Sequence, residues 1–358
     1  MTTLLSSYRL GELTLPNRMV MAPMTRVRAT ADGQATPSMA TYYAQRATAG
    51  LLVTEGVQPS LIGQSNPGTP GLHTDGQTAS WRQVTEAVHT NGGRIFAQLM
   101  HGGRVSHPDT TGLPPVGPSA VPAVGEVFTP TGPQPAPTPR ALETHEVPEH
   151  AESYAQAARR AVEAGFDGVE LHGASGYLIS QFLSSNANVR TDGYGGSVAG
   201  RIRFAVEAAA ATVDAVGAAR TGIRLSPGGT FWGVQETEVL ELYTALLTEL
   251  ARLELAYVHF QATAGDPTLI ALRRAWPGAF IVNPVMPMGP KQTDRVAADH
   301  WLGLGADLIS FGRAFLANPD LVERLRTGAP IAPIDESTLY AGGDAGYLTY
   351  PTHQHAAS

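Results

Sequence analysis

The sequence alternates short apolar runs with stretches of helical periodicity, and this alternation limits the possible folds more than any other feature. The runs lack polar alternation, which is typical of parallel strands covered on both faces. They lie at 18–22, 51–55, 94–99, 168–171, 222–225, 257–260, 280–283 and 308–311. Stretches with apolar residues three and four positions apart lie between them, at 39–48, 78–91, 148–164, 198–216, 236–253, 267–275 and 293–304. Eight such units predict an α/β fold, a single (β/α)₈ barrel.

The turns that lead into the strands support the same prediction. EAGFDGVEL (163–171) and GLGADLISF (303–311) both place a glycine after a helix and an acidic residue before a strand. Glycine permits the left-handed conformation that ends a helix. The alternative is an open doubly wound sheet, but its G-x-G-x-x-G fingerprint is missing from the first turn, APMTRVRATADG (22–33). Since α/β barrels commonly run to about 250 residues or more as one unit, we predict one domain over 1–358.

Proline is concentrated in one segment that does not belong to the alternation. Ten of the 27 prolines lie between 108 and 139. Such a segment is either an extended surface loop or a lid, because long loops in compact domains are usually functional or disordered. It follows the third strand at the face where barrel enzymes keep their active sites, which favours a rim or lid over 108–145. The C-terminal tail is predicted to begin at 334.

Composition excludes several classes of function. The chain has 24 basic and 31 acidic side chains, a net charge of −7, and no block of Lys and Arg that could bind nucleic acid. It has no cysteine, hence no disulfide, thiolate nucleophile or iron–sulfur cluster. It also has no apolar run of roughly 20 residues and no basic-then-apolar start. We expect a cytoplasmic protein without nucleic-acid or membrane partners.

The residues at the carboxyl ends of the predicted strands are mostly hydrogen-bonding groups. A barrel places them together at one face. They include no His-x-His pair, carboxylate cluster or lysine, so neither a metal site nor a Schiff base is expected. This set suits a bound cofactor that the protein orients and tunes. A structural ion pair remains the alternative role for Arg224, and a structural role remains possible for Gln98. The set comprises Pro23, Met24, Thr25, Gly56, Gln98, His101, His172, Ser175, Tyr177, Arg224, Asn283, Gly312 and Arg313.

Long motifs across the whole chain resemble the Old Yellow Enzyme family of FMN-dependent ene-reductases. The resemblance implies a (β/α)₈ barrel, non-covalent FMN at its mouth, NADPH or NADH as reductant, and an α,β-unsaturated small-molecule substrate. The motifs are NRMVMAPMTR (17–26), TPSMATYYAQRATAGLLVTEG (36–56), AQLMHGGRVSHPD (97–109), GVELHGASGYLISQFLSSNANVRTDGYGGS (168–197), GIRLSPGGTF (222–231) and FGRAFLANPDLVERL (311–325).

The resemblance also implies roles for individual residues. His172 and Ser175 donate hydrogen bonds to the substrate oxygen, and Tyr177 donates a proton to the α-carbon. Thr25 bonds the carbonyl side of the flavin ring, and it places the chain in a threonine branch rather than a cysteine branch. The remaining flavin contacts are Pro23, Met24, Gly56, Gln98, Arg224, Gly312 and Arg313, with Gly312 and Arg313 on the phosphate. The remaining substrate contacts are Asn66, Met100 and Tyr347.

The chain departs from the family pattern at several of these positions. Ser175 stands where the family has a second histidine or an asparagine, so we expect altered substrate activation. The strand-seven turn NPVMPMGP (283–290) has three prolines where backbone donors to phosphate are usual. Two further functions stay open: a flavin-binding barrel with weak or lost alkene reduction, and a non-flavin lyase or isomerase. A monomer and a homodimer are equally compatible with the sequence.

Overall fold

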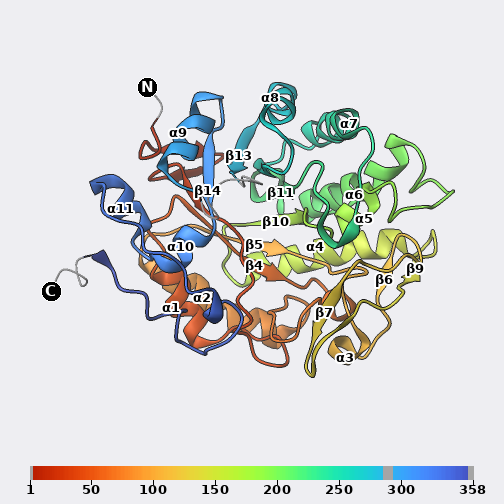
Figure 1. The fold of residues 1–358 in the computed structure, drawn as a ribbon, viewed down its shortest axis with the longest axis horizontal. Helices are drawn as coiled ribbons and strands as arrows, with labels where there is room; N and C mark the ends of the chain where they lie inside the picture. The colour runs from red at the N-terminus through yellow and green to blue at the C-terminus, as the bar shows by residue number, and fades with distance from the viewer. Residues whose placement is uncertain (1–2, 285–292, 354–358) are drawn as a thin grey trace.

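The computed structural model describes residues 3–284 and 293–353, and its central feature is a closed barrel of eight parallel strands (Figure 1). The strands pair in chain order, and the last, β14, pairs with the first, β3. The prediction of a (β/α)₈ barrel is confirmed, and the doubly wound alternative is wrong because the sheet closes on itself. The strands are β3 (Met19–Met21), β4 (Leu51–Val57), β5 (Ile95–Leu99), β10 (Gly168–Gly173), β11 (Thr221–Leu225), β12 (Tyr257–Gln261), β13 (Ala279–Asn283) and β14 (Leu308–Phe311).

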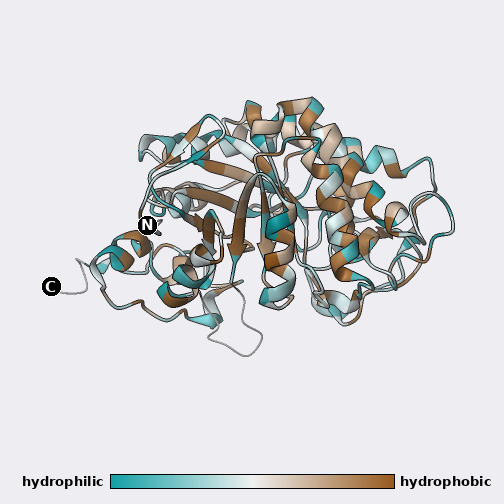
Figure 2. Cartoon of the chain, turned by 90° about the horizontal axis from the view of Figure 1, so that it is seen from above, coloured by the Kyte–Doolittle hydropathy of each residue, from teal (hydrophilic) through white to brown (hydrophobic). Residues whose placement is uncertain are grey.

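Helices surround the barrel, and Figure 2 shows them with mixed hydropathy around largely apolar strands. Local sequence sets where they begin: Thr36 accepts from the N–H of Met39 at the start of the first helix, and Thr74 accepts from the N–H of Gln77 at the second. No helix within the described residues is long and apolar enough to cross a bilayer. The main helices are α1 (Pro37–Ala44), α2 (Asp75–Thr90), α4 (Val147–Glu163), α6 (Val198–Val216), α7 (Val239–Ala251), α8 (Asp266–Ala275) and α9 (Arg295–Gly303).

The repeated turn signature has a structural role at both of its clear copies. Gly165 and Gly305 have φ values of 92° and 97°, so both adopt the left-handed conformation that the signature predicts. The acidic residue two positions later accepts a hydrogen bond from the first or second residue of the preceding barrel strand. Asp167 accepts from the N–H of Ile95 at 2.8 Å, and Asp307 accepts from that of Phe280 at 3.0 Å. The signature therefore fixes neighbouring strands to each other.

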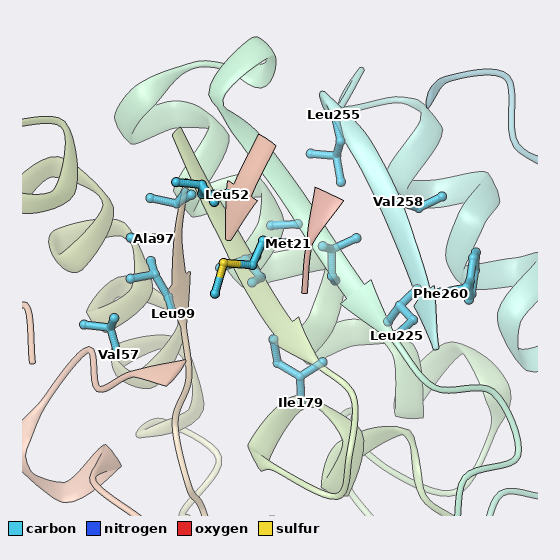
Figure 3. Packing of buried hydrophobic residues seen from close by; sticks show 14 of the residues in the cluster. Met21, Leu52, Val57, Ala97, Leu99, Ile179, Leu225, Leu255, Val258 and Phe260 are labelled. Atoms are coloured by element: carbon cyan, nitrogen blue, oxygen red, sulfur yellow. The ribbon is translucent and has the colours of Figure 1, made fainter. Parts of the chain in front are cut away.

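Alternate residues of each strand face opposite sides of the sheet and form two apolar clusters. The outer cluster packs between strands and helices and includes Met21, Leu52, Leu99 and Phe260 (Figure 3). The inner cluster fills the amino-terminal end of the barrel with side chains such as Val20, Phe96, Tyr257, Ile281 and Leu308. The hairpin of β1 (Tyr8–Leu10) and β2 (Leu13–Leu15) adds Leu10 and Leu15 to this inner cluster. This end is therefore sealed, and only the carboxyl end is left for a ligand.

The proline-rich segment after β5 is more regular than the sequence indicates. It contains a short helix, α3 (Pro108–Thr111), and an antiparallel hairpin of β7 (Glu126–Thr129) and β8 (Gly132–Pro135). A parallel pair of β6 (Val116–Gly117) and β9 (Arg140–Ala141) joins the two ends of the segment. The hairpin is thus carried on a closed base beside the carboxyl end of the barrel.

The C-terminal segment, 334–353, is held by arginines from the first turn of the barrel. Arg26 donates to the carbonyls of Leu339 and Gly346, at 3.0 and 2.8 Å. Arg28 donates to four carbonyl oxygens of the same segment, those of Thr338, Leu339, Ala341 and Gly343. These arginine hydrogen bonds all end on backbone carbonyl oxygens of the segment.

Candidate active site

A cavity of about 400 Å³ opens at the carboxyl end of the barrel. Its volume lies within the usual range of small-molecule sites, roughly 300–1,000 Å³. The strand ends supply most of its polar lining, and the proline-rich segment and the C-terminal segment supply aromatic groups. The predicted residues that line it are Pro23, Thr25, Gly56, Asn66, Gln98, Met100, His172, Ser175, Tyr177 and Arg224.

A buried layer of polar side chains lies next to this cavity within the barrel. Glu170 accepts from Nε2 of Gln98 at 2.8 Å and bonds Nδ1 of His259 at 2.8 Å. Nε2 of His259 lies 2.9 Å from the Ser310 hydroxyl. Burial raises the pKa of Glu170, but His259, its hydrogen bonds and Arg224 outweigh burial and leave this pKa below its ordinary value. Because Gln98 uses one amide N–H on Glu170, its amide oxygen and its second N–H are left for a ligand.

Arg224 carries an unused hydrogen-bond donor inside the barrel. Its Nη2 donates to Oδ1 of Asn283 at 2.9 Å, but its buried Nε has no partner among the described residues. Glu170 is a nearby charge, but no ion pair within 4.0 Å joins it to Arg224 in the described part of the chain. Buried donors normally have an acceptor, so the unpartnered Nε of Arg224 indicates that this side chain binds a ligand. The alternative role, a structural ion pair, is less consistent with this arrangement.

His172 and Tyr177 face each other across the cavity wall, with ring centroids 5.1 Å apart. Burial, with the charge of Arg224 next, holds the pKa of His172 well below its ordinary value, so the imidazole is neutral. Its buried Nδ1 has no partner within residues 3–284 and 293–353. Burial raises the pKa of Tyr177 to about 12, which keeps its hydroxyl protonated. Both rings therefore offer N–H or O–H donors to a ligand.

Ser175 has an unusual backbone conformation for a serine. Its φ is 58°, in the left-handed region, and its N–H donates to the hydroxyl of Ser226 at 2.9 Å. Its own hydroxyl lies 3.2 Å from the Gln261 amide oxygen, at the end of β12. Ser175 is thus fixed by contacts to the ends of two neighbouring strands, β11 and β12.

One predicted substrate contact is wrong. Tyr347 is fully buried and lies outside the cavity lining. Its ring stacks on Tyr42 with centroids 4.1 Å apart, and the guanidinium groups of Arg26 and Arg28 lie 5.1 Å from it. Aromatic stacking and two cation–π contacts bury this ring in the anchor of the C-terminal segment. Tyr340 of the same segment lines the cavity instead.

Three predicted cofactor contacts lie beyond the cavity lining. Gly312 and Arg313 follow β14 where the short helix α10 (Arg313–Ala317) begins, and Met24 follows β3. A Cβ at Gly312 would meet only the Met24 sulfur, at 3.5 Å, so the backbone there is open to a close approach. The strand-seven turn falls largely within 285–292, outside the described residues.

Gly56 has a close neighbour, Met100, that the sequence does not indicate. A Cβ at this position would lie 2.6 Å from the sulfur of Met100, closer than side chains approach. The absence of a side chain at Gly56 therefore makes room for Met100, and both residues line the cavity.

Sequence reasoning missed several residues of the cavity wall. Trp232 has a φ of 57° and follows β11, and Phe128 comes from the hairpin of the proline-rich segment. Their only sequence signal is an aromatic residue near a strand end or within a proline-rich loop. The full set missed is Val27, Pro67, Phe128, Thr129, Trp232 and Tyr340.

Comparison with known proteins identifies the class to which this barrel and cavity belong. Residues 4–331 match the family model described as NADH:flavin oxidoreductase / NADH oxidase family. Chanoclavine-I aldehyde reductase of Penicillium roqueforti is 40% identical, with 98% of this chain and 96% of that protein covered. A structure of morphinone reductase in complex with tetrahydroNAD is 41% identical, with a TM-score of 0.93 and 99% of each chain covered. The old yellow enzyme homologue of Zymomonas mobilis is 38% identical, with a TM-score of 0.93 and coverage of 98% and 99%.

These matches define a flavin oxidoreductase barrel. The chain belongs to the NADH:flavin oxidoreductase / NADH oxidase family, that is, to the Old Yellow Enzyme family. It is an FMN-dependent ene-reductase with a nicotinamide nucleotide as reductant. The cavity fits this cofactor, because the orphaned Nε of Arg224 and the free oxygen of Gln98 match the acceptors and donors of a flavin pyrimidine edge.

Proposed function

We propose that this cavity reduces alkenes conjugated to a carbonyl or nitro group, and that His172, Ser175 and Tyr177 act on the substrate. The observation that carries the proposal is the meeting of these three donors in one cavity with Gln98 and Arg224. FMN bound there supplies the hydride, taken from NADPH or NADH, to the β-carbon of the alkene. The protein residues supply orientation, charge stabilisation and a proton.

Thr25, Gln98 and Arg224 hold the flavin ring in this proposal. The unpartnered Nε–H of Arg224 would donate to the bound cofactor, and its positive charge would stabilise negative charge on the ring. We assign the chain to the threonine branch of the family because Thr25 lines the cavity, where its hydroxyl would bond the carbonyl side of the flavin ring. Pro23, Met24 and Gly56 lie against the ring.

The phosphate group is held at the end of β14. The Gly312 backbone, which has room for a close approach, would donate its N–H, and Arg313 would add a guanidinium charge. We propose that FMN is held non-covalently; a thioether linkage is excluded because the chain has no cysteine.

His172 and Ser175 donate hydrogen bonds to the carbonyl or nitro oxygen of the substrate. The low pKa of His172 supports this role, since a neutral imidazole stays a donor without adding a charge to the cavity. Withdrawal of electron density toward that oxygen makes the β-carbon accept hydride. Asn66 and Met100 shape the wall beside the substrate.

Tyr177 donates its proton to the α-carbon. A hydroxyl with a pKa of about 12 is a weak acid, but the α-carbon that forms is a strong base. The ring position beside His172 puts this hydroxyl within the same cavity as the activating donors.

The location, domain organisation and oligomeric state of the enzyme are also part of the proposal. We place it in the cytoplasm as one domain, a monomer or homodimer, with no nucleic-acid or membrane partner. Phe128 and Thr129 support a rim or lid role for 108–145, because both line the cavity. Light scattering of the purified protein decides between monomer and dimer.

The test follows the visible spectrum of the purified protein. We expect a yellow protein that NADPH bleaches under anaerobic conditions, and whose colour cyclohexenone restores. A colourless protein that takes up no FMN would contradict the assignment as a flavin enzyme. A flavin that NADPH reduces but cyclohexenone and a nitroalkene leave reduced would instead point to electron transfer without alkene reduction.

A further inference from the structure

The Ser175 hydroxyl has only one proton, and two groups compete for it. As placed, it can donate to the Gln261 amide oxygen at 3.2 Å. In that arrangement, no proton of Ser175 is left for a substrate oxygen. The backbone N–H of Ser175 cannot replace the hydroxyl as a donor to the substrate, because it already donates to the Ser226 hydroxyl. The orientation of the Gln261 amide therefore decides whether Ser175 can donate to a substrate.

The distance between the two side chains indicates that the Gln261 amide donates a hydrogen bond to the Ser175 hydroxyl oxygen and does not accept one from it. O–H···O bonds centre near about 2.7–2.8 Å, whereas N–H···O bonds extend to about 3.2 Å. A half-turn of the Gln261 amide about its terminal bond puts NH₂ at the same place as the oxygen. The separation of 3.2 Å between the two side chains suits an N–H donor on the serine oxygen. Gln261 is partly exposed at the end of β12, so its amide oxygen can then face water.

We propose that Gln261 is a positioning residue whose amide NH₂ donates to Ser175 Oγ and thereby directs the Ser175 proton to the substrate oxygen. The inference rests on the proposed function and deepens it. A bond accepted by a hydroxyl oxygen also polarises the hydroxyl, which strengthens the bond it donates. The pair of Ser175, which follows β10, and Gln261, at the end of β12, thus provides the second donor beside His172.

The test replaces the donor by an acceptor of the same shape. In Gln261→Glu at pH 8, the carboxylate has no proton and accepts that of Ser175. We expect kcat/KM for cyclohexenone to fall on the order of 10-fold, the scale of a hydrogen bond to a charged group. Cyclohexanone, a saturated ketone, should inhibit the variant more weakly by a similar factor. Gln156→Glu is the matched control, because Gln156 is exposed on α4, and it should match the wild type.

Two further variants separate positioning from structural damage. Ser175→Ala should lower kcat/KM for cyclohexenone about as much as Gln261→Glu does. The double variant should show little further decrease, because both changes remove the same donor. Gln261→Leu removes the partner without capturing the proton, so we expect a smaller loss of about threefold, mainly in KM. The flavin absorbance per protein reports whether each variant is folded and loaded.

Three results would overturn the inference. The first is a wild-type kcat/KM for cyclohexenone in both Gln261 variants. The second is an equal fall in kcat/KM in Gln261→Leu and Gln261→Glu. The third is a double variant, Gln261→Glu with Ser175→Ala, whose fall in kcat/KM is the product of the two single falls. Failure of the proposed function can be distinguished from failure of this inference, because in that case the wild-type enzyme itself does not reduce cyclohexenone. If Gln261→Glu does not load flavin, the comparison of Gln261→Leu with Ser175→Ala still decides the question.

Discussion

Glu55 is a buried carboxyl group in the strand β4, next to the cavity residue Gly56, and it should make stability depend on pH. Its side chain is 1% exposed. It accepts from the N–H of Arg26 at 3.3 Å and from the hydroxyl of Tyr43 at 3.5 Å. Burial raises its pKa from 4.5 to about 7, although the Arg26 N–H and the charges of Arg26 and Arg28 oppose the rise.

The size and sign of the effect follow from these two pKa values. The difference between 4.5 and about 7 corresponds to about 3 kcal/mol, at roughly 1.4 kcal/mol for each pH unit. Because the folded state binds the proton more tightly, this stability is fully present below pH 4.5. It is lost as the pH rises through about 7, where Glu55 ionises in its buried position.

The assay compares the free energy of unfolding in urea between pH 5 and 8.5 for the wild type and Glu55→Gln. Glutamine keeps one acceptor and one donor, as protonated Glu55 does. We expect the stability of the wild type to fall relative to the variant by up to about 3 kcal/mol across this range. The comparison is needed because His101 and His172, whose pKa values burial lowers, make stability rise with pH up to about 6.5.

Glu241→Gln is the matched control, since Glu241 is exposed on α7 and its replacement should leave the wild-type profile unchanged. Parallel profiles for the wild type and Glu55→Gln between pH 5 and 8 would refute the reasoning. They would mean that Glu55 has the same proton affinity in the folded and unfolded chain.

Three further changes probe the cavity. Tyr177→Phe should slow reduction of cyclohexenone by about 10²–10⁴-fold and that of a nitroalkene much less, since water can protonate a nitronate; equal losses in steady-state rates would argue against the proton-donor role. Arg224→Leu should weaken FMN binding at least about 10-fold in a fluorescence titration, because it removes the free Nε–H and leaves Glu170 without its nearby positive charge. Gly56→Ala should lower the free energy of unfolding by about 1–3 kcal/mol, and adding Met100→Ala should recover most of it; no recovery would mean that another contact is responsible.

The barrel could be predicted from the sequence because its strands are buried on both faces and read as continuous apolar runs. All eight predicted runs coincide with strands of the barrel. The hairpin in the proline-rich segment escaped prediction, since Pro133 and Pro135 remove donors from β8 and its residues alternate between partial burial and exposure. Two-stranded hairpins tolerate proline because each strand has a free edge.

Residues of the cavity lining could be predicted where a sequence motif contains them. They could not be predicted where contacts between distant segments bring them to the cavity. His172, Ser175 and Tyr177 come from one motif at one strand end, and all three line the cavity. Gln261 lies 86 positions from Ser175, and a single glutamine after an apolar run carries no signal. Tyr340 and Tyr347 look equivalent in a glycine-rich segment, and only the stack with Tyr42 assigns them to different places.

The arginine anchors of the C-terminal segment have a consequence for how this enzyme can change. Arg26 and Arg28 bind backbone carbonyl oxygens of the segment, and the buried ring of Tyr347 stacks on Tyr42, so the attachment does not depend on the side chain at Tyr340. Tyr340 can thus be exchanged while the chain around it stays in place. Substrate scope at this wall of the cavity can therefore change through mutation of Tyr340, by natural drift or in a designed library, as long as the arginines and Tyr347 keep the segment in place.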